Sequence, residues 1–355
     1  SPTGTYSRRS LPGEIRSAEN AGSVSGVPSR VRTVPLIQAE QLTKSFGDTK
    51  ALAGLDLEVE QGTVLGVLGP NGAGKTTAVR ILTTLLRPDG GRATIDGIDV
   101  AKEPRRIRSR IGLTGQYAAV DERLTARENL ELIGRFFRMS GGDSKRRAQE
   151  LLDRFRLDQA GDRVVSGFSG GMRRRLDISM SLVARPTVLF LDEPTTGLDP
   201  RSRNAMWDLI DELTAEGMTT LLTTQYLEEA DRLAKEIVVI DRGQAIAKGT
   251  ADELKDLLGG ARAEVALGEG ADQGAVIAGL GGLVNPDAEP AVGAGTVTVP
   301  LRQGTTTPQV VRALDAAGVA VRDVTVSRPT LDDVFLTLTG HAAEEVAADD
   351  EGDQS

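Results

Sequence analysis

The residues best suited to chemistry form a glycine-rich run with the spacing of a phosphate-binding loop. The run consists of Gly69, Pro70, Asn71, Gly72, Ala73, Gly74, Lys75, Thr76 and Thr77. It lies between an apolar stretch, 64–68, that predicts a buried strand and a stretch, 78–82, that predicts a helix start. There the glycines let backbone N–H groups face a phosphate, Lys75 reaches the β- and γ-phosphates, and the Thr76 hydroxyl ligates Mg²⁺. A glycine-rich turn without a ligand is the plainer interpretation, which the complete spacing and the flanking elements disfavour.

Two adjacent carboxylates, Asp192 and Glu193, follow the apolar stretch 189–191, which predicts the end of another buried strand. In P-loop nucleotidases an aspartate at this place holds Mg²⁺ through its water shell. The glutamate after it is placed to orient or deprotonate the attacking water. A strand-end acidic pair is by itself usually a solvated loop start, but its combination with the phosphate loop favours the catalytic interpretation.

A second site for an anion is predicted at Ser169, Gly170, Gly171 and Met172, which precede a helical pattern. Taken alone, serine followed by two glycines is a helix N-cap. The exposed N–H groups of a helix start also bind anions, by the same physics as the phosphate loop. Two such sites in one chain raise the question of how both could serve one nucleotide.

Composition excludes several classes of function. The chain of 355 residues has no cysteine, and its single histidine is His341, near the C-terminus. Disulfides, thiolate metal sites and cysteine nucleophiles are therefore excluded, and a histidine metal site or Ser–His catalysis is disfavoured. The net charge of −9 argues against general binding of nucleic acid, which depends on neutralising phosphates. No apolar run approaches the roughly 18–20 residues that span a bilayer, so we expect no transmembrane segment.

Strand and helix patterns alternate through most of the chain. Strands are expected at 36–42, 55–59, 64–68, 92–95, 111–114, 188–191, 219–223 and 237–240. Residues 125–185 read as mostly helical. This alternation predicts an α/β fold with a mostly parallel sheet covered on both faces, within a domain of residues 34–258.

A second, smaller domain is expected beyond Gly259 and Gly260. Over 262–340 the patterns predict a small α+β domain with a ferredoxin-like arrangement, and the Gly/Pro-rich link 281–295 could hide a short strand. Residues 1–33, rich in Ser, Gly, Pro and Arg, are expected to be disordered. The same holds for an acidic tail at 341–355.

In its motifs the chain resembles the nucleotide-binding subunit of an ABC transporter over roughly residues 36–258. Within that family it is most similar to the antibiotic-resistance exporters typified by daunorubicin-resistance ATPases. The stretches that carry the resemblance are Gly170–Asp177 and Leu191–Pro200, and Pro329–Leu336 resembles that subgroup's accessory C-terminal domain. The fold implied is a P-loop NTPase ABC cassette with antiparallel β and helical subdomains, the latter at about 117–185, plus the small C-terminal α+β domain.

The resemblance also implies a role for each matching position. Phe46 would stack on adenine, and Gln116 would touch Mg²⁺ and the attacking water and signal to a membrane subunit. Ser169–Met172 would be the signature loop, which binds the γ-phosphate of ATP held by the opposite protomer, with Phe168 and Met172 in place of the commoner Leu and Gln. Asp199 would lie across the same interface. Each nucleotide would then be sandwiched between two chains, which answers the question of two anion sites.

One position departs from the general family pattern. Gln225 stands where most members have a histidine, although the resistance subgroup resembles this glutamine form. A glutamine amide can donate to a γ-phosphate oxygen but carries no charge. Sensing of the γ-phosphate is therefore expected to survive and charge-based stabilisation to weaken, while an ordinary polar helix start is the plainer alternative.

Two further features are left open by the sequence. The run Arg173, Arg174 and Arg175 fits either an anionic partner or a solvated helix face, with neither favoured. The pair Phe136 and Phe137 fits docking of a partner helix, but core packing is the better-supported interpretation.

The resulting hypothesis is an ATPase at the cytoplasmic face of the membrane that dimerises around ATP and Mg²⁺. Glu193, Gln225 and Lys75 would be catalytic, and Thr76, Gln116 and Asp192 would serve the metal. The family implies a separate integral-membrane permease of the ABC-2 type and export of a hydrophobic drug, antibiotic or lipid. A soluble ABC ATPase acting on ribosomes or DNA is the alternative, and a P-loop kinase or GTPase would not need Ser169–Met172.

Overall fold

The structure is a computed structural model that describes residues 35–115, 119–257, 261–268, 271–286, 289–293, 295–302 and 304–339. The disordered extension expected over 1–33 and the acidic tail expected over 341–355 lie outside the described residues. Residues 35–257 are called the main domain below, and residues 261–327 the small domain.

An antiparallel sheet opens the main domain. Its strands are β1 (Ile37–Phe46), β2 (Thr49–Val59), β4 (Gly90–Ile95) and β5 (Ile98–Asp99), in the order β2-β1-β4-β5. The sequence located β1, β2 and β4 but ended β1 early and began β2 late. The missed halves are mostly half-exposed or exposed, so they lack the apolar pattern from which a strand is predicted.

The central sheet has six strands in the order β10-β9-β3-β8-β7-β6. They are β3 (Val64–Leu68), β6 (Ile111–Thr114), β7 (Val188–Asp192), β8 (Thr219–Thr224), β9 (Glu236–Asp241) and β10 (Gln244–Gly249). All neighbours pair in parallel except β10, which is antiparallel to β9. The expected mostly parallel sheet is therefore confirmed, and the edge strand β10, whose residues are largely exposed, is the strand that the sequence did not predict.

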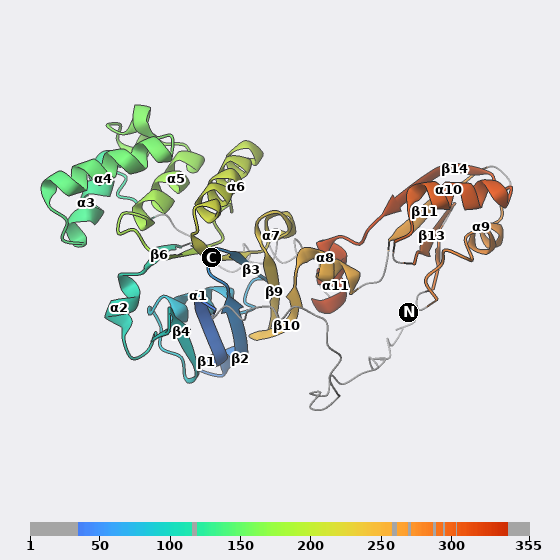
Figure 1. The fold of residues 1–355 in the computed structure, drawn as a ribbon, viewed down its shortest axis with the longest axis horizontal. Coiled ribbons are helices and arrows are strands. Elements are labelled where there is room, and N and C mark those ends of the chain that lie inside the picture. The colour runs from blue at the N-terminus through green and yellow to red at the C-terminus, as the bar shows by residue number, and fades with distance from the viewer. Residues whose placement is uncertain are drawn as a thin grey trace, which may run out of the picture. The chain divides into compact units, whose positions relative to one another are not determined.

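Both faces of the central sheet are buried. Alternate residues of β7 belong to different cores: Phe190 packs with α1 (Lys75–Leu82) and the antiparallel sheet, whereas Leu191 packs with the helices beyond the other face. Those helices include α6 (Pro200–Ala215). Figure 1 shows the two sets of elements on opposite sides of the central strands. Burial on both faces explains why β3 and β7 are continuous apolar runs rather than alternating ones.

The described part of the helical region between β6 and β7, residues 119–187, contains three α-helices, each begun by a hydroxyl side chain. Helix α3 (Ala126–Phe136) is capped by Thr125, α4 (Gly141–Arg154) by Ser140 and α5 (Gly170–Ser181) by Ser169. Each hydroxyl accepts a backbone N–H that has no partner within its helix. These caps set where the helices start, and the last of them places the start of α5.

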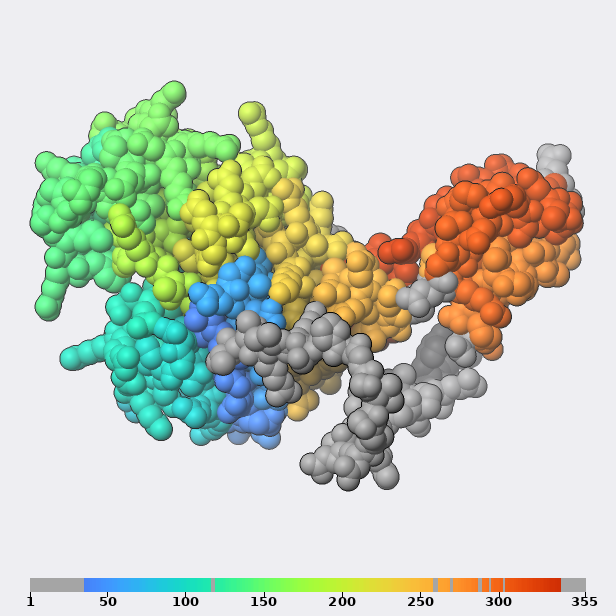
Figure 2. Space-filling model, viewed as in Figure 1, coloured from blue at the N-terminus to red at the C-terminus, as the bar shows by residue number. Residues whose placement is uncertain are grey.

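The small domain has the βαββαβ order of a ferredoxin-like fold. Its elements are β11 (Arg262–Leu267), α9 (Gln273–Gly279), β12 (Ala291–Val292), β13 (Thr296–Pro300), α10 (Thr307–Ala316) and β14 (Val321–Ser327). The strands form an antiparallel sheet in the order β12-β13-β11-β14, and α9 and α10 bury their apolar residues with its strands. Its atoms form a compact body (orange to red in Figure 2). The ferredoxin-like prediction and the short strand hidden in 281–295 are both present.

The last helix, α11 (Leu331–Thr339), packs on the main domain, although the sequence grouped it with the small one. Its buried residues Leu331, Val334 and Phe335 share a core with α7 (Leu227–Leu233) and α8 (Ala251–Asp256). Strand β9 and Leu68 of β3 contribute to the same core. Helix α11 thus packs behind the strand that leads into the phosphate loop.

Candidate functional site: a nucleotide pocket and a separate signature turn

The glycine-rich run forms a loop between β3 and α1, as its sequence predicts. Gly74 is the N-cap of α1 with φ of +107°, and Gly72 has φ of +78°, both in the left-handed region that favours glycine. A side chain at Gly74 would also collide with the carbonyl oxygen of Ala51. The glycines therefore allow a tight turn, in which the loop N–H groups and the N-terminus of α1 can point toward the same bound anion.

Lys75 is buried and held within the loop. Its ammonium donates to the carbonyl oxygens of Gly69, at 2.7 Å, and Pro70, at 3.2 Å. It also lies 3.4 Å from Oε1 of Glu193. Burial lowers the pKa of Lys75, against the opposing charges of Glu193 and Asp192. The structure thus brings two of the predicted catalytic residues, Lys75 and Glu193, into contact.

Asp192 faces the hydroxyls of two neighbouring elements. The Thr223 hydroxyl, on β8, donates to Oδ1 of Asp192 at 2.5 Å, and the Thr76 hydroxyl donates to the same oxygen at 3.3 Å. Two of the three residues predicted to serve a metal, Thr76 and Asp192, are therefore adjacent near the carboxyl ends of the parallel strands. An aspartate and a hydroxyl oxygen are hard oxygen donors, and Mg²⁺ takes few protein ligands because it keeps waters and phosphate oxygens. The residues present fit that ion.

Glu193 has an unusual backbone conformation, with φ of +50°, in the left-handed region. Its N–H donates to the Thr223 carbonyl at 3.0 Å, and its side chain is buried beside Lys75. A non-glycine residue in this region persists only where its surroundings hold it there. The contacts that hold Glu193 are therefore part of the site.

A pocket of about 520 Å³ opens over these groups. It is lined by Phe46, Ala51, Pro70, Asn71, Gly72, Gly74, Lys75, Thr76, Thr77, Glu193, Thr196 and Gln225. Its volume suits a ligand of nucleotide size. Phe46 is half exposed at its rim, and Gln225, at the end of β8, is half-buried in it. Gln116 lies outside the described residues.

The signature turn, residues 169–172, is not part of this pocket. The Ser169 hydroxyl accepts the Met172 N–H at 3.3 Å, and both Ser169 and Gly170 are exposed. The turn lies against the start of α6, where a side chain at Gly171 would collide with the Ser202 side chain. Asp199 caps that helix by accepting from the Ser202 N–H at 3.0 Å, and this contact with Ser202 lowers the pKa of Asp199. One chain therefore carries a nucleotide pocket and, apart from it, an exposed helix start suited to an anion.

The sequence did not identify the buried charges behind the pocket. Arg174 is 7 % exposed, and Asp177, one turn later on α5, is also buried. Burial raises the pKa of Asp177 to about 6, against the Ala119 N–H and Arg174. Glu229, on α7, is buried where it accepts from the Thr195 hydroxyl at 2.8 Å and from the Trp207 indole at 3.0 Å. Burial raises the pKa of Glu229 as well. The sequence did contain a signal for the two charges on α5. The helical period places residues 174 and 177 on the same face as the apolar residue 178, which indicates that this face is buried.

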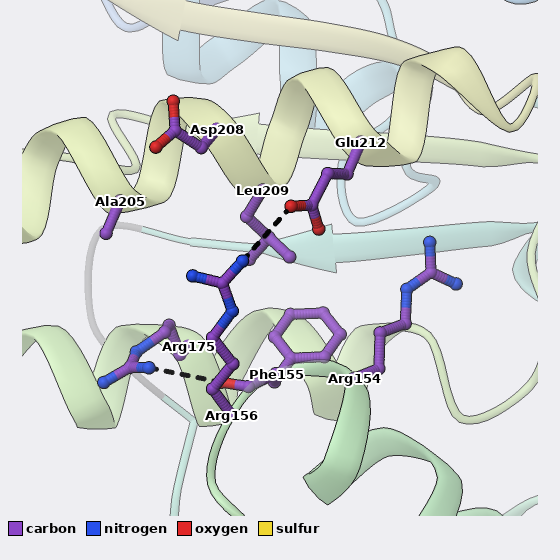
Figure 3. A pocket seen from close by; sticks show the side chains of 8 residues that line it. All are labelled: Arg154, Phe155, Arg156, Arg175, Ala205, Asp208, Leu209 and Glu212. Carbon is purple, nitrogen blue, oxygen red and sulfur yellow. Dashed lines mark hydrogen bonds and ion pairs between the residues drawn. The ribbon is translucent and has the colours of Figure 1, made fainter.

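A second cavity lies between the end of α4 and α6 but is too small for a ligand. Its volume is about 30 Å³, room for roughly one water. Figure 3 shows its lining, where Arg175 donates to the Phe155 carbonyl at 3.2 Å and Arg156 lies 3.4 Å from Glu212. The contact between Arg156 and Glu212 joins the helical region to α6. The cavity is therefore a packing gap at the seam between the helical region and α6, and it is not part of the nucleotide site.

The core-packing interpretation of Phe136 and Phe137 is wrong. Phe136 is 71 % exposed and Phe137 is 46 % exposed, at the end of α3. The apolar residues of α3 that do reach the core include Ala126 and Leu130. The two phenylalanines follow the last buried turn of the helix, so its apolar stripe does not bury them.

Comparison with known proteins agrees with this geometry. The family model described as ABC transporter matches residues 52–196, and the one described as the DrrA1-3-like C-terminal domain matches residues 249–339. The daunorubicin resistance ATP-binding protein DrrA2 of Streptomyces coeruleorubidus is 55 % identical over 88 % of this chain and 97 % of its own length. The chain belongs to the ABC-transporter ATP-binding proteins. It is an ATPase with the P-loop NTPase fold of this family.

Other members of the ABC family extend the likeness. The doxorubicin resistance ATP-binding protein DrrA of Mycobacterium tuberculosis strain H37Rv is 47 % identical over 85 % of this chain and 92 % of its own length. A solved ATP-binding subunit of an ABC transporter matches with a TM-score of 0.57 and 29 % identity, over 63 % of this chain and 93 % of the other. A dimeric ATP-binding cassette bound to ADP and Pi matches with a TM-score of 0.55 and 27 % identity, over 60 % and 98 %. Among the described residues, no helix combines the length and apolarity needed to cross a bilayer.

Proposed function

We propose that this ABC ATPase is the energy-supplying subunit of an exporter and that two copies close around two ATP molecules. The observation that carries the proposal is the separation of its two anion-ready elements. The phosphate loop lines the pocket with Lys75 and Glu193, whereas the exposed signature turn at Ser169 lies against α6. An ATP in the pocket would be completed by the signature turn of a second copy, in agreement with the dimeric form of a related cassette.

Binding of the triphosphate is the task of the loop and Lys75. The N–H groups of the glycine turns and the start of α1 supply dipoles of the right sign, and the Lys75 ammonium supplies a full charge. Phe46, at the rim, offers an aromatic face for the adenine base. Thr76 and Asp192 would hold Mg²⁺, which neutralises charge that develops on the phosphates when it is bound.

Hydrolysis requires an attacking water and a group to orient it or take its proton. Glu193 is the carboxylate at the pocket wall, 3.4 Å from the Lys75 ammonium. We assign the role of general base to Glu193 on this position. Gln225, on the same pocket wall, would donate its amide N–H to a γ-phosphate oxygen. Positioning and charge stabilisation would then supply most of the rate.

The partner is a membrane permease, and the transported compound is an antibiotic or a similarly apolar molecule. Support comes from the relatives, whose names include daunorubicin resistance and Nod factor export. The exposed phenylalanines at the end of α3 are a surface suited to a helix of that permease, because neighbouring exposed apolar side chains that form a patch often mark a site of protein contact. We place the ATPase at the cytoplasmic face of the membrane through this contact.

The proposal is tested by Glu193→Gln. The amide keeps the size of the side chain but cannot accept a proton, so turnover should fall by about 100-fold or more while ATP affinity stays within threefold. Binding of a fluorescent ATP analogue and release of phosphate by the full-length chain measure the two quantities. Unchanged turnover would remove Glu193 from its role.

A further inference from the structure

Arg174 uses all of its hydrogen-bond donors inside the protein. Its guanidinium donates to the carbonyl oxygens of Pro194 at 2.7 Å, Glu193 at 3.0 Å and Asp192 at 3.2 Å. It also donates to the Gly115 carbonyl at 2.6 Å and lies 3.4 Å from Oδ2 of Asp177. A guanidinium has five N–H donors, and each of these five contacts uses one. No ordinary solvated arginine makes such a set.

The side chains of the three consecutive arginines therefore make contacts in three different parts of the structure. Arg173 contacts Glu122 at 3.2 Å on the surface, and Arg175 reaches the Phe155 carbonyl at the seam shown in Figure 3. Only Arg174 turns toward the nucleotide pocket, where it binds the backbone on both sides of Glu193. The stretch it binds contains the left-handed φ of Glu193. Donors from a rigid fork can hold that conformation against its strain.

Asp177 binds the backbone on the C-terminal side of residues 116–118, and Arg174 binds it on the N-terminal side. Oδ1 of Asp177 accepts the Ala119 N–H at 2.9 Å, while Arg174 binds the Gly115 carbonyl. One pair of side chains, a single turn apart on α5, therefore binds the backbone on both flanks of that segment. Both side chains are buried, so the contacts are shielded from water and electrostatically strong.

We infer that Arg174 and Asp177 are positioning residues that tie the signature helix α5 to Glu193 and to both flanks of residues 116–118 within one chain. Because α5 begins at the signature turn, a displacement of that turn by a neighbouring copy is passed to the catalytic carboxylate of this one. The inference rests on the proposed function, since it requires Glu193 to act in hydrolysis. Neither side chain touches the pocket, so both act through other residues.

The matched variants are Arg174→Lys, Arg174→Met and Asp177→Asn. A lysine keeps the charge but offers at most three donors from one nitrogen, and methionine offers none. Asparagine keeps an acceptor for Ala119 but removes the charge that faces Arg174. We expect turnover to fall about tenfold in Arg174→Lys and about 100-fold in Arg174→Met, with ATP affinity within threefold of the parent. Asp177→Asn should fall a few-fold. Single-turnover phosphate release with the full-length chain in excess over MgATP measures the rates.

The control is Arg147→Met. Arg147 also donates to a backbone carbonyl of the helical region, that of Leu182 at the far end of α5, at 2.7 Å. We expect Arg147→Met to lower thermal stability, as we also expect of Arg174→Met. Unlike Arg174→Met, it should leave the turnover of the folded fraction unchanged. Equal losses of turnover in the two methionine variants, each corrected for folded fraction by circular dichroism, would show that Arg174 is only structural and overturn the inference.

A double variant separates this inference from the proposed function. If Arg174 acts through Glu193, Arg174→Lys should cost under threefold once Glu193→Gln is present, because coupled residues are not additive. A full tenfold loss in that background would overturn the positioning role. An unchanged rate in Glu193→Gln alone would instead overturn the assignment of the base, whatever the arginine variants do.

Discussion

At the scale of single residues, we expect Gln225 to set how the site responds to the γ-phosphate and to pH. It lies on the pocket wall with Lys75 and Glu193, and its amide stays neutral at every pH at which the protein is folded. A histidine there would titrate near pH 6.5 and add a proton-dependent charge. The neutral amide therefore gives hydrogen bonding without that dependence.

We expect Gln225→Ala to lower turnover about tenfold with little change in ATP affinity, because one donor to the γ-phosphate is removed. Gln225→His should restore most of the rate and add a limb to the rate–pH profile between about pH 6 and 7, with activity higher on the acid side. Phosphate release from pH 5.5 to 8.5 checks both variants. A parent profile that already contains this limb, or an alanine variant with full turnover, would contradict the role given to Gln225.

Residues within one motif were predictable, and residues that differ only in burial were not. The spacing from Gly69 to Thr77 predicts the turns and the lysine because the loop's geometry depends on neighbours in sequence. Arg173, Arg174 and Arg175 are chemically the same, and only the packing of α5 decides that the second one is buried. The contacts of Arg174 come from Gly115 and from the turn at Glu193, distant in sequence.

At the scale of elements, α11 buttresses the side of the main domain that carries the phosphate loop and α7. Phe335 is 1 % exposed in the core that it shares with Leu68, Leu227 and Leu254. Phe335→Ala should lower the free energy of unfolding by about 3 kcal/mol, because it removes buried apolar surface and leaves a cavity. Chemical denaturation followed by the fluorescence of the single tryptophan, Trp207, measures it.

The neighbouring residue of α11 supplies the control for that measurement. Leu336 is 49 % exposed, and Leu336→Ala should change stability by less than about 0.5 kcal/mol. Similar losses in the two variants would contradict burial of Phe335 as the cause of its effect on stability.

Helix α3 presents the exposed Phe136 to a partner in the proposed assembly. Phe136→Ser should reduce co-purification of the full-length chain with its membrane permease several-fold and leave the ATPase rate of the isolated chain within twofold. Leu85→Ser is the matched control, because Leu85 is also large, apolar and exposed, at 64 %, but lies after α1. Retention of the permease by Phe136→Ser, or its loss in both variants, would move the docking surface elsewhere.

Elements that carry an apolar period were found from the sequence, and the largely exposed edge strand β10 was not. The strands β3 and β7 are continuous apolar runs because both of their faces are buried. Strand β10 lies at the sheet edge, and most of its residues are exposed, so no pattern in Gln244–Gly249 marks it. The packing of α11 on the main domain was also not predicted. The sequence of an amphipathic helix shows which of its faces is apolar, but not which surface that face contacts.

At the scale of the whole molecule, the proposed assembly brings the two anion sites together through a second copy. In the Glu193→Gln background, ATP should convert the chain from monomer to dimer in size-exclusion chromatography, and ADP should not. Ser169→Arg places a large side chain at the exposed signature turn, so it should abolish this dimer while the pocket still binds ATP. Ser140→Arg, at another exposed helix N-cap of the helical region, is the control and should dimerise normally.

Under the same proposed arrangement, the ATPase rate of the isolated chain should rise more steeply than linearly with its concentration. A linear dependence down to dilute protein, or an ATP-dependent dimer that survives Ser169→Arg, would show that each chain completes its own site.

The amino-acid sequence by itself determined which residues form the loop between β3 and α1, which carboxylates end a strand, and that the sheet is mostly parallel. Those features depend on short-range backbone geometry and on the period of apolar residues, which are local properties of the chain. The tertiary structure decided the rest. It buried one arginine of three, exposed two phenylalanines, seated α11 on the main domain, and kept the signature turn away from the phosphate loop. Each of these outcomes depends on contacts between segments far apart in the sequence, and no local pattern encodes which segments meet.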